Sequence, residues 1–185
     1  PLQNPLPIWM PAGSSETIEF AAERHIPIAR VWNPTVVFQD AFEYYKEVAK
    51  EQFGWEAGPE QCIGSRYIHV AETTEQAIEE CRAAVMYVRR LSTFSRPVQV
   101  PAPVPGLQTD RSYDYRKRSK GAEMPGPGTP FEKLRESGYI VCGDPDYVTD
   151  WLANDMETAG YGHFMGMFRV GSNSHENVIK SKNLF

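Results

Sequence analysis

The sequence predicts an α/β fold in which helices cover a parallel sheet. Short apolar segments alternate along the chain with longer segments whose apolar residues recur every three or four positions. Turn and cap residues separate the two kinds of segment, and strands that alternate with helices in this way form parallel sheets. The chain has 185 residues, 41% of them hydrophobic, which is enough for a core in one domain.

The first unit joins a short strand to a helix through a turn of small residues. Residues 7–10 form an apolar run that breaks at Pro11, and Ala12–Gly13 follow. Ser14 or Ser15 can cap the next helix, because each hydroxyl can accept a hydrogen bond from a backbone N–H of the first turn. Such an open helix N-terminus also suits a phosphate group. An ordinary capped turn is the competing interpretation, and the turn taken alone favours it.

The second unit begins with an apolar strand at residues 27–32. Asn33–Pro34 then turn the chain into a helix, because an Asn-Pro dipeptide favours the start of a turn. That helix ends near Gly54, and its apolar residues repeat on one face. The spacing therefore predicts an amphipathic helix packed on the sheet.

The third strand is expected at residues 66–72, with its aliphatic side chains on one side. Thr73, with Gln76 three residues later, fits a capping box, in which two side chains satisfy each other's backbone N–H groups. The helix behind this box is expected to run to about Leu91.

The composition changes between residues 92 and 138. Pro and Gly are frequent there, and apolar periodicity is lost apart from a helical turn expected at residues 131–135. A segment of this length inside a compact domain is either a functional loop or disordered. Its basic cluster at residues 111–120 has a plain interpretation as a solvated charge run.

Ordered structure is expected to resume with a strand at residues 139–143. Asp144 is the expected N-cap of the next helix and Pro145 its first residue, because proline has no N–H to lose at that position. Gly160 is the expected end of this helix.

The last unit comprises a strand at residues 163–168, a small polar turn at Gly171–Ser174 and a helix around Val178. The turn could bind an anion, but a helix cap is the simpler interpretation.

About four such units make half of an eight-stranded βα barrel. A whole barrel takes roughly 250 residues, so a chain of 185 residues is too short once the irregular middle is set aside. Half a barrel leaves two open sheet edges, which are expected to pair with another segment.

Composition argues against several classes of protein. The net charge of −5 does not suggest a nucleic-acid partner, which usually meets a basic face. No apolar run approaches a membrane span, and no signal-peptide pattern is present. Cys62, Cys81 and Cys142 form no CxxC pair or disulfide framework, which indicates a reducing compartment.

The histidines predict no metal site, because they do not cluster at the spacing of metal ligands. Isolated histidines are more often structural than catalytic. We therefore assign no role to His25, His69, His163 and His175.

Several of these segments, taken in order, resemble the flavin-dependent luciferase-like monooxygenases, and look closest to the branch that contains the bacterial luciferase α subunit. The resemblance covers nearly the whole chain except residues 92–105. The segments that carry it are Ile8–Ser15, Pro27–Trp32, Tyr44–Ala49, Tyr113–Tyr115, Gly143–Val148 and Glu176–Phe185.

The resemblance implies a TIM (βα)₈ barrel of which residues 1–185 supply the C-terminal half, about strands 5–8 with their helices. It implies a cytoplasmic bacterial enzyme that uses reduced FMN, delivered by a flavin reductase, and O₂ to oxidise a small organic substrate. The missing N-terminal half of the barrel, from the same gene or another chain, would carry several catalytic side chains, so no catalytic residue is assigned here. A homo-oligomer is also implied. A deazaflavin-dependent oxidoreductase and a non-catalytic flavin-binding or assembly subunit are the alternatives.

The resemblance also implies roles for particular residues. The turn formed by Ala12, Gly13, Ser14 and Ser15 would hold the flavin phosphate. Trp32 would lie against the isoalloxazine ring, although a packing aromatic at the barrel mouth is the alternative. Residues 92–138 would be a mobile lid that excludes water. The lid residues assigned to the closed site are Arg111, Tyr115, Arg116, Lys117, Arg118 and Lys120.

Overall fold

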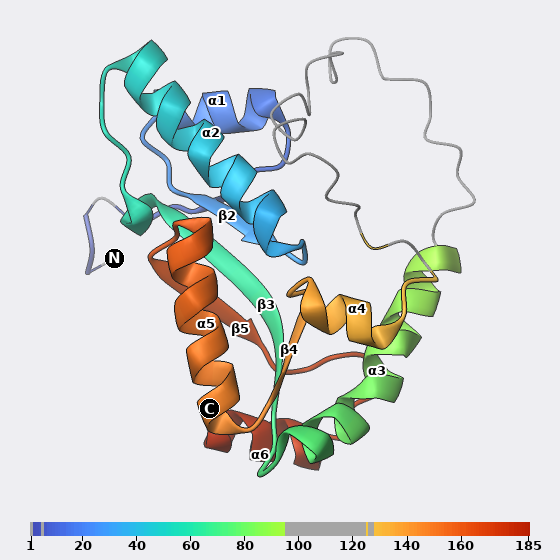
Figure 1. The fold of residues 1–185 in the computed structure, drawn as a ribbon. Coiled ribbons are helices and arrows are strands. Elements are labelled where there is room, and N and C mark those ends of the chain that lie inside the picture. Colours follow the sequence, from blue (N-terminus) through green and yellow to red (C-terminus); the bar gives the residue numbers. More distant parts are fainter. Residues whose placement is uncertain (1, 5, 95–124, 126–127) are drawn as a thin grey trace.

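The structure, a computed structural model, describes residues 2–4, 6–94, 125 and 128–185. The strands are β1 (Met10–Pro11), β2 (Ile28–Val31), β3 (Cys62–Val70), β4 (Ile140–Gly143) and β5 (His163–Met167). The helices are α1 (Ser15–Glu23), α2 (Thr35–Phe53), α3 (Thr74–Phe94), α4 (Phe131–Glu136), α5 (Pro145–Ala159) and α6 (His175–Leu184). A 3₁₀ turn, η1 (Pro59–Gln61), precedes β3. The predicted α/β class and the alternation of strands with helices are confirmed (Figure 1).

The described strands all pair in parallel, as the sequence predicts. β3 is long enough to pair with β2 and then with β4 along one edge, and with β5 along the other. Tyr67 pairs with both Ile140 of β4 and Met167 of β5, which places those two strands on opposite edges. Residues 63–65 likewise pair with both β2 and β5. The continuous sheet is therefore β1-β2-β3-β5, and β4 follows β2 along the same edge of β3.

The first strand is shorter and later than the predicted residues 7–10. β1 pairs with β2 only at Met10 and Pro11, opposite Ile28 and Ala29. β2 begins at Ile28, so the residues before Met10 have no β2 residue opposite them. Pro11 is tolerated in this strand because Met10 N and Ala12 N donate the hydrogen bonds to β2, so pairing with β2 needs no N–H at Pro11.

The third strand begins at Cys62, four residues before the predicted start at residue 66, and ends at Val70. Gly64 and Ser65 interrupt the apolar pattern, so no strand is predicted for residues 62–65. Tyr161 explains the glycine, because a Cβ on Gly64 would lie 2.6 Å from its ring. The remaining strand ends agree with the prediction to within two residues.

Most predicted helix ends are confirmed. Asp144 caps α5 by accepting a hydrogen bond from Tyr147 N at 2.9 Å, and Pro145 is the first residue of that helix. Gly54 and Gly160 end α2 and α5 in the left-handed conformation, with φ of 72° and 71°.

The capping box predicted at the start of α3 is only half formed. Thr73 Oγ1 accepts from Gln76 N at 3.2 Å, as expected. The Gln76 side chain instead donates to Glu80 Oε1 at 2.6 Å. α3 also continues past Leu91 to Phe94.

The helices lie on different sides of the sheet. α1 and α2 pack on each other and on the first two strands, in a core that includes Ile18, Ile28 and Phe42. α5 packs against α2 and against Ile68 and Val70 of β3, which confirms that these two aliphatic side chains share a face. α3 and α4 lie beside β4 (Figure 1), in a core that includes Tyr67.

Most of the predicted lid lies outside the described residues. Within residues 92–138, the structure describes the end of α3 and the short helix α4, which confirms the helical turn expected near residue 131. No helix in the described part of the chain is long and apolar enough to cross a membrane.

Candidate functional site

The turn between β1 and α1 has the geometry of a helix cap. Ser14 Oγ accepts a hydrogen bond from Thr17 N at 3.3 Å and lies 2.9 Å from Thr17 Oγ1. The competing interpretation of the turn, a serine-capped helix, is therefore present. A hydroxyl that accepts a hydrogen bond still has a proton to donate, so the cap does not prevent Ser14 from also meeting an anion.

Arg30 is the residue of this site that our reading of the sequence missed. It lies on β2 with 6% of its surface exposed, and its Nη1 donates to Ala12 O at 2.6 Å. A Cβ on Gly13 would lie 3.0 Å from the same nitrogen, so the turn needs glycine to approach the guanidinium. A fixed positive charge therefore lies beside the N-terminus of α1. The available signal was a charged residue in an apolar strand, since a buried arginine needs a partner.

The first turn of α1 also carries a negative charge. Glu16 is its second residue, and Ser15 before it is buried. The carboxylate offsets part of the attraction that Arg30 and the helix dipole offer to an anion.

Trp32 follows β2 directly and has a left-handed backbone conformation, with φ of 54°. Its indole stacks on Tyr67 of β3, with ring centroids 5.7 Å apart and planes within 2° of parallel. Its Nε1–H points to Met167 Sδ of β5 at 2.8 Å. The side chain is nevertheless 43% exposed, so it packs on its neighbours and still presents surface outward.

The two predicted parts of the site lie at the same rim of the sheet. Residues 12–15 follow the carboxyl end of β1, and Trp32 follows the carboxyl end of β2. The two strands are parallel neighbours, with Pro11 opposite Ala29. Carboxyl ends of adjacent parallel strands are where ligands bind in α/β folds. The predicted lid residues 111, 115–118 and 120 lie outside the described part of the chain.

The histidines have separate surroundings. His69 is fully buried, with Nε2 2.8 Å from Glu80 Oε2 and Nδ1 3.3 Å from Asn173 Nδ2. Burial opposes ionisation of Glu80, but its hydrogen bonds to His69 and Gln76 lower its pKa. No group of three or more potential metal-ligating side chains occurs among the described residues.

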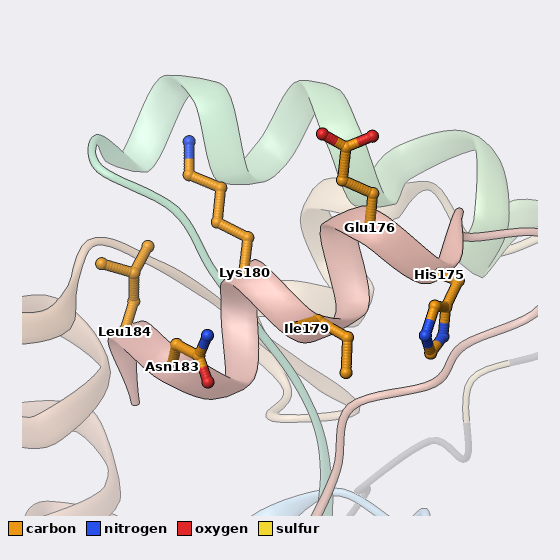
Figure 2. A pocket seen from close by; sticks show the side chains of 6 residues that line it. All are labelled: His175, Glu176, Ile179, Lys180, Asn183 and Leu184. Atoms are coloured by element: carbon orange, nitrogen blue, oxygen red, sulfur yellow. The ribbon is translucent and has the colours of Figure 1, made fainter.

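A hollow of about 530 Å³ lies on α6. Figure 2 shows His175, Ile179 and Asn183 on one side of that helix and Glu176 and Lys180 on the other. All its lining residues come from this one helix, so it lacks the convergent polar groups from several elements that mark a ligand site. It shares no residue with the rim at Ala12–Ser15 and Trp32.

Comparison with known proteins gives a consistent result. The sequence model of the family described as luciferase-like monooxygenase matches residues 1–163. The chain is 27% identical over 187 residues to the alkanal monooxygenase alpha chain of Photobacterium leiognathi, covering 97% of this chain and 49% of that protein. The chain thus spans about half the length of this relative.

Solved structures show the same fold at low sequence identity. Monooxygenase RslO1 from Streptomyces bottropensis matches 99% of this chain and 47% of its own, with a TM-score of 0.64 and 16% identity. The oxygenating constituent of 3,6-diketocamphane monooxygenase from Pseudomonas putida, in complex with FMN, matches 91% and 44%, with a TM-score of 0.57 and 18% identity. Coenzyme F420-dependent enzymes are also among the matching structures.

Proposed function

Because the chain belongs to the luciferase-like monooxygenase family, we propose that it forms about half of an FMN-dependent monooxygenase of the two-component type. The observation that carries this proposal is the rim at which a helix N-terminus, the Arg30 guanidinium and the Trp32 indole come from two neighbouring parallel strands. Reduced FMN would supply the electrons that activate O₂ for oxidation of a small organic substrate. A separate flavin reductase would deliver it.

The residues of the turn fit a phosphate. Gly13 leaves room for the backbone to approach an anion, and a Cβ there would meet Arg30. The Ser14 hydroxyl can donate to an anion when Thr17 Oγ1 is the donor between these two hydroxyls, and the first turn of α1 offers backbone N–H groups. Glu16 works against this attraction, so the net effect depends on Arg30 remaining charged, which an arginine does at any physiological pH.

Trp32 would form one wall for the isoalloxazine ring. Its stacking on Tyr67 and its hydrogen bond to Met167 hold the indole beside β3, at the carboxyl ends of β2 and β5. A ring that stacks on this surface would exclude water from one of its faces. The residues at 92–138 would close over the opposite side as a lid.

The remaining half of the barrel would complete the sheet. In the part of the chain that the structure describes, β1 pairs only with β2, and β5 pairs only with β3. Exposed His163 and Met165 lie on β5. We assign β1, β2, β3 and β5 to strands 5–8 of the barrel, with the first four strands in the same gene or in another chain.

Ser14→Asp in the intact protein tests the phosphate site. Aspartate is also a good N-cap, so the helix keeps its cap while the turn gains a negative charge. We expect FMN affinity to fall at least about tenfold, because two like charges within a few ångströms repel by more than about 1.4 kcal/mol. Riboflavin, which has no phosphate, should bind with unchanged affinity.

Ser174→Asp is the matched control, because Ser174 caps α6 in the same way, with Oγ 3.1 Å from Asn177 N. It should change the affinity for neither ligand. Equal FMN affinity in Ser14→Asp and wild type would reject the phosphate assignment.

A deazaflavin cofactor is the alternative, and the F420-dependent enzymes among the matching structures favour it. Both cofactors carry a phosphate on the ring's side chain, so the same turn would serve either. The absorption spectrum of the cofactor that copurifies with the intact protein distinguishes them.

A further inference from the structure

Trp32 has a backbone conformation that needs support from its surroundings. Its φ of 54° lies in the left-handed region, and among the described residues only His25 shares this feature without being glycine. A bulky side chain is strained there, because its Cβ approaches the following carbonyl oxygen. Such strain persists only where neighbouring groups hold the chain in place.

The carbonyls on both sides of Trp32 accept side-chain hydrogen bonds. Asn33 Nδ2 donates to Val31 O, just before the indole-bearing residue. Arg66 Nη1 donates to Asn33 O, just after it. Arg66 comes from β3, the strand next to the one that Trp32 follows. The turn is therefore fixed from outside by a side chain distant in sequence.

Arg66 can hold this carbonyl because its own position is fixed. It is fully buried, and its Nε and Nη2 contact Asp155 Oδ2 at 3.0 and 2.8 Å. Its guanidinium carbon lies 3.9 Å from the centre of the Phe38 ring. With one edge of the planar fork occupied by the carboxylate, the remaining nitrogen Nη1 is directed at Asn33 O.

Two further groups hold Asp155 in turn. Tyr161 Oη donates to Asp155 Oδ2 at 2.6 Å, and Thr35 Oγ1 donates to Oδ1 at 2.5 Å. Thr35 is the first residue of α2, directly after the turn that contains Trp32. The hydrogen bonds around Asp155 thus connect β3, α5 and the start of α2, and Arg66 links them to the Asn33 carbonyl.

The preceding turn has the same arrangement. Arg30 of β2 donates to Ala12 O in the turn after β1, as Arg66 of β3 donates to Asn33 O in the turn after β2. In both cases a buried arginine on the next strand binds a carbonyl in the turn at the rim.

We propose that Arg66, held by Asp155, is a positioning residue that fixes the Trp32 indole in the orientation it presents to the isoalloxazine ring. The orientation of Trp32 is a property of the chain alone, whereas its use against a flavin ring rests on the proposed function. Arg66 itself does not touch the cofactor and acts only through Trp32.

The test uses fluorine NMR of the intact protein labelled with 5-fluorotryptophan, recorded without flavin. Trp32→Leu identifies the Trp32 resonance by its loss. Arg66→Lys keeps a positive charge for Asp155, but a single ammonium group cannot also reach Asn33 O. We expect the Trp32 resonance to move or broaden by more than its own line width, while the Trp9 and Trp55 resonances stay unchanged.

Arg82→Lys is the matched control, because Arg82 forms an exposed ion pair with Glu132 on α4. It should leave the Trp32 resonance in place. Where Arg66→Lys does not fold, Thr35→Val replaces it, since this variant removes a hydroxyl that contacts both Asp155 and Arg66 Nη2 without leaving a buried charge. An unchanged Trp32 resonance in the folded variant overturns the proposal.

A titration with FMN separates this proposal from the proposed function. Trp32→Leu and Arg66→Lys should each weaken FMN binding by about two- to tenfold, the range of an aromatic stacking contact. The double variant should be no weaker than Trp32→Leu alone, because Arg66 acts through Trp32. Losses that multiply contradict the positioning role. Absence of FMN binding by the wild type would reject the flavin site and leave the NMR result standing.

Discussion

Asp155→Asn is expected to destabilise the protein strongly, because it leaves Arg66 charged and buried. The Asp155 side chain is 1% exposed, and its carboxylate accepts hydrogen bonds from two nitrogens of the fully buried Arg66 guanidinium. An amide has one acceptor oxygen, and its NH₂ group would face donors of Arg66 or Tyr161. Removing one partner of a buried ion pair typically costs about 3–5 kcal/mol, which is our estimate for the loss in free energy of unfolding.

Urea denaturation of the intact protein measures this loss. Asp150→Asn is the matched control, because Asp150 lies on the same helix and is exposed, so it should change the midpoint little. Arg66→Met combined with Asp155→Leu removes both charges, and we expect it to recover at least half of the loss. A loss below about 1 kcal/mol for Asp155→Asn would refute the assignment of a coupled buried pair. So would a double variant whose loss equals the sum of the losses measured for Arg66→Met and Asp155→Leu alone.

Three further outcomes follow from single residues. Gly54→Ala should lower the free energy of unfolding by about 1 kcal/mol, measured by urea denaturation, because φ is 72° there; Gly54→Asn should lose less, and equal stability of all three forms would contradict the left-handed cap. Hydrogen bonds from Tyr147 N and Thr74 lower the pKa of Asp144. The contribution of its ionised carboxylate to the free energy of unfolding is therefore complete above the ordinary pKa near 3.9, and it is lost as pH falls through the lower pKa of the folded state. The urea midpoint of Asp144→Asn should therefore fall less on acidification than that of wild type, and parallel curves would count against it. Burial raises the pKa of Cys62 to about 12, so iodoacetamide should modify it only after unfolding, as measured by mass spectrometry; rapid labelling of the folded protein would exclude a buried thiol.

Local chemistry made most of the fold predictable. Asp144–Pro145 and Gly160 mark the ends of α5 because their backbone requirements are strong and independent of the rest of the chain. The parallel arrangement follows from the alternation of elements, since a helix must return the chain before the next strand begins. The first four residues of β3 were missed because a glycine weakens a strand pattern, and Gly64 is explained only by the Tyr161 ring packed against it.

The candidate site was predictable only where its residues are adjacent in sequence. Residues 12–15 form a single turn, so small residues and serines could be recognised together. Arg30 lies on the following strand and approaches Gly13 only through strand pairing. A pairing register cannot be read from one strand alone, so the charge at this turn had no signal in its own segment.

The two buried arginines suggest a rule for interpreting sequences in which parallel strands alternate with helices. Arg30 and Arg66 would each be expensive to bury alone, and each binds a backbone carbonyl in the turn that follows the preceding strand. A carbonyl is present in every turn whatever its side chains, so the hydrogen bond itself requires no particular side chain, although the Arg30 guanidinium restricts residue 13 to glycine. An arginine in the middle of a parallel strand therefore indicates that the turn before it is held in a fixed position. In this chain those two turns carry Gly13 and Trp32, which suggests that the strands supply the rigidity and the turns supply the groups that face a ligand.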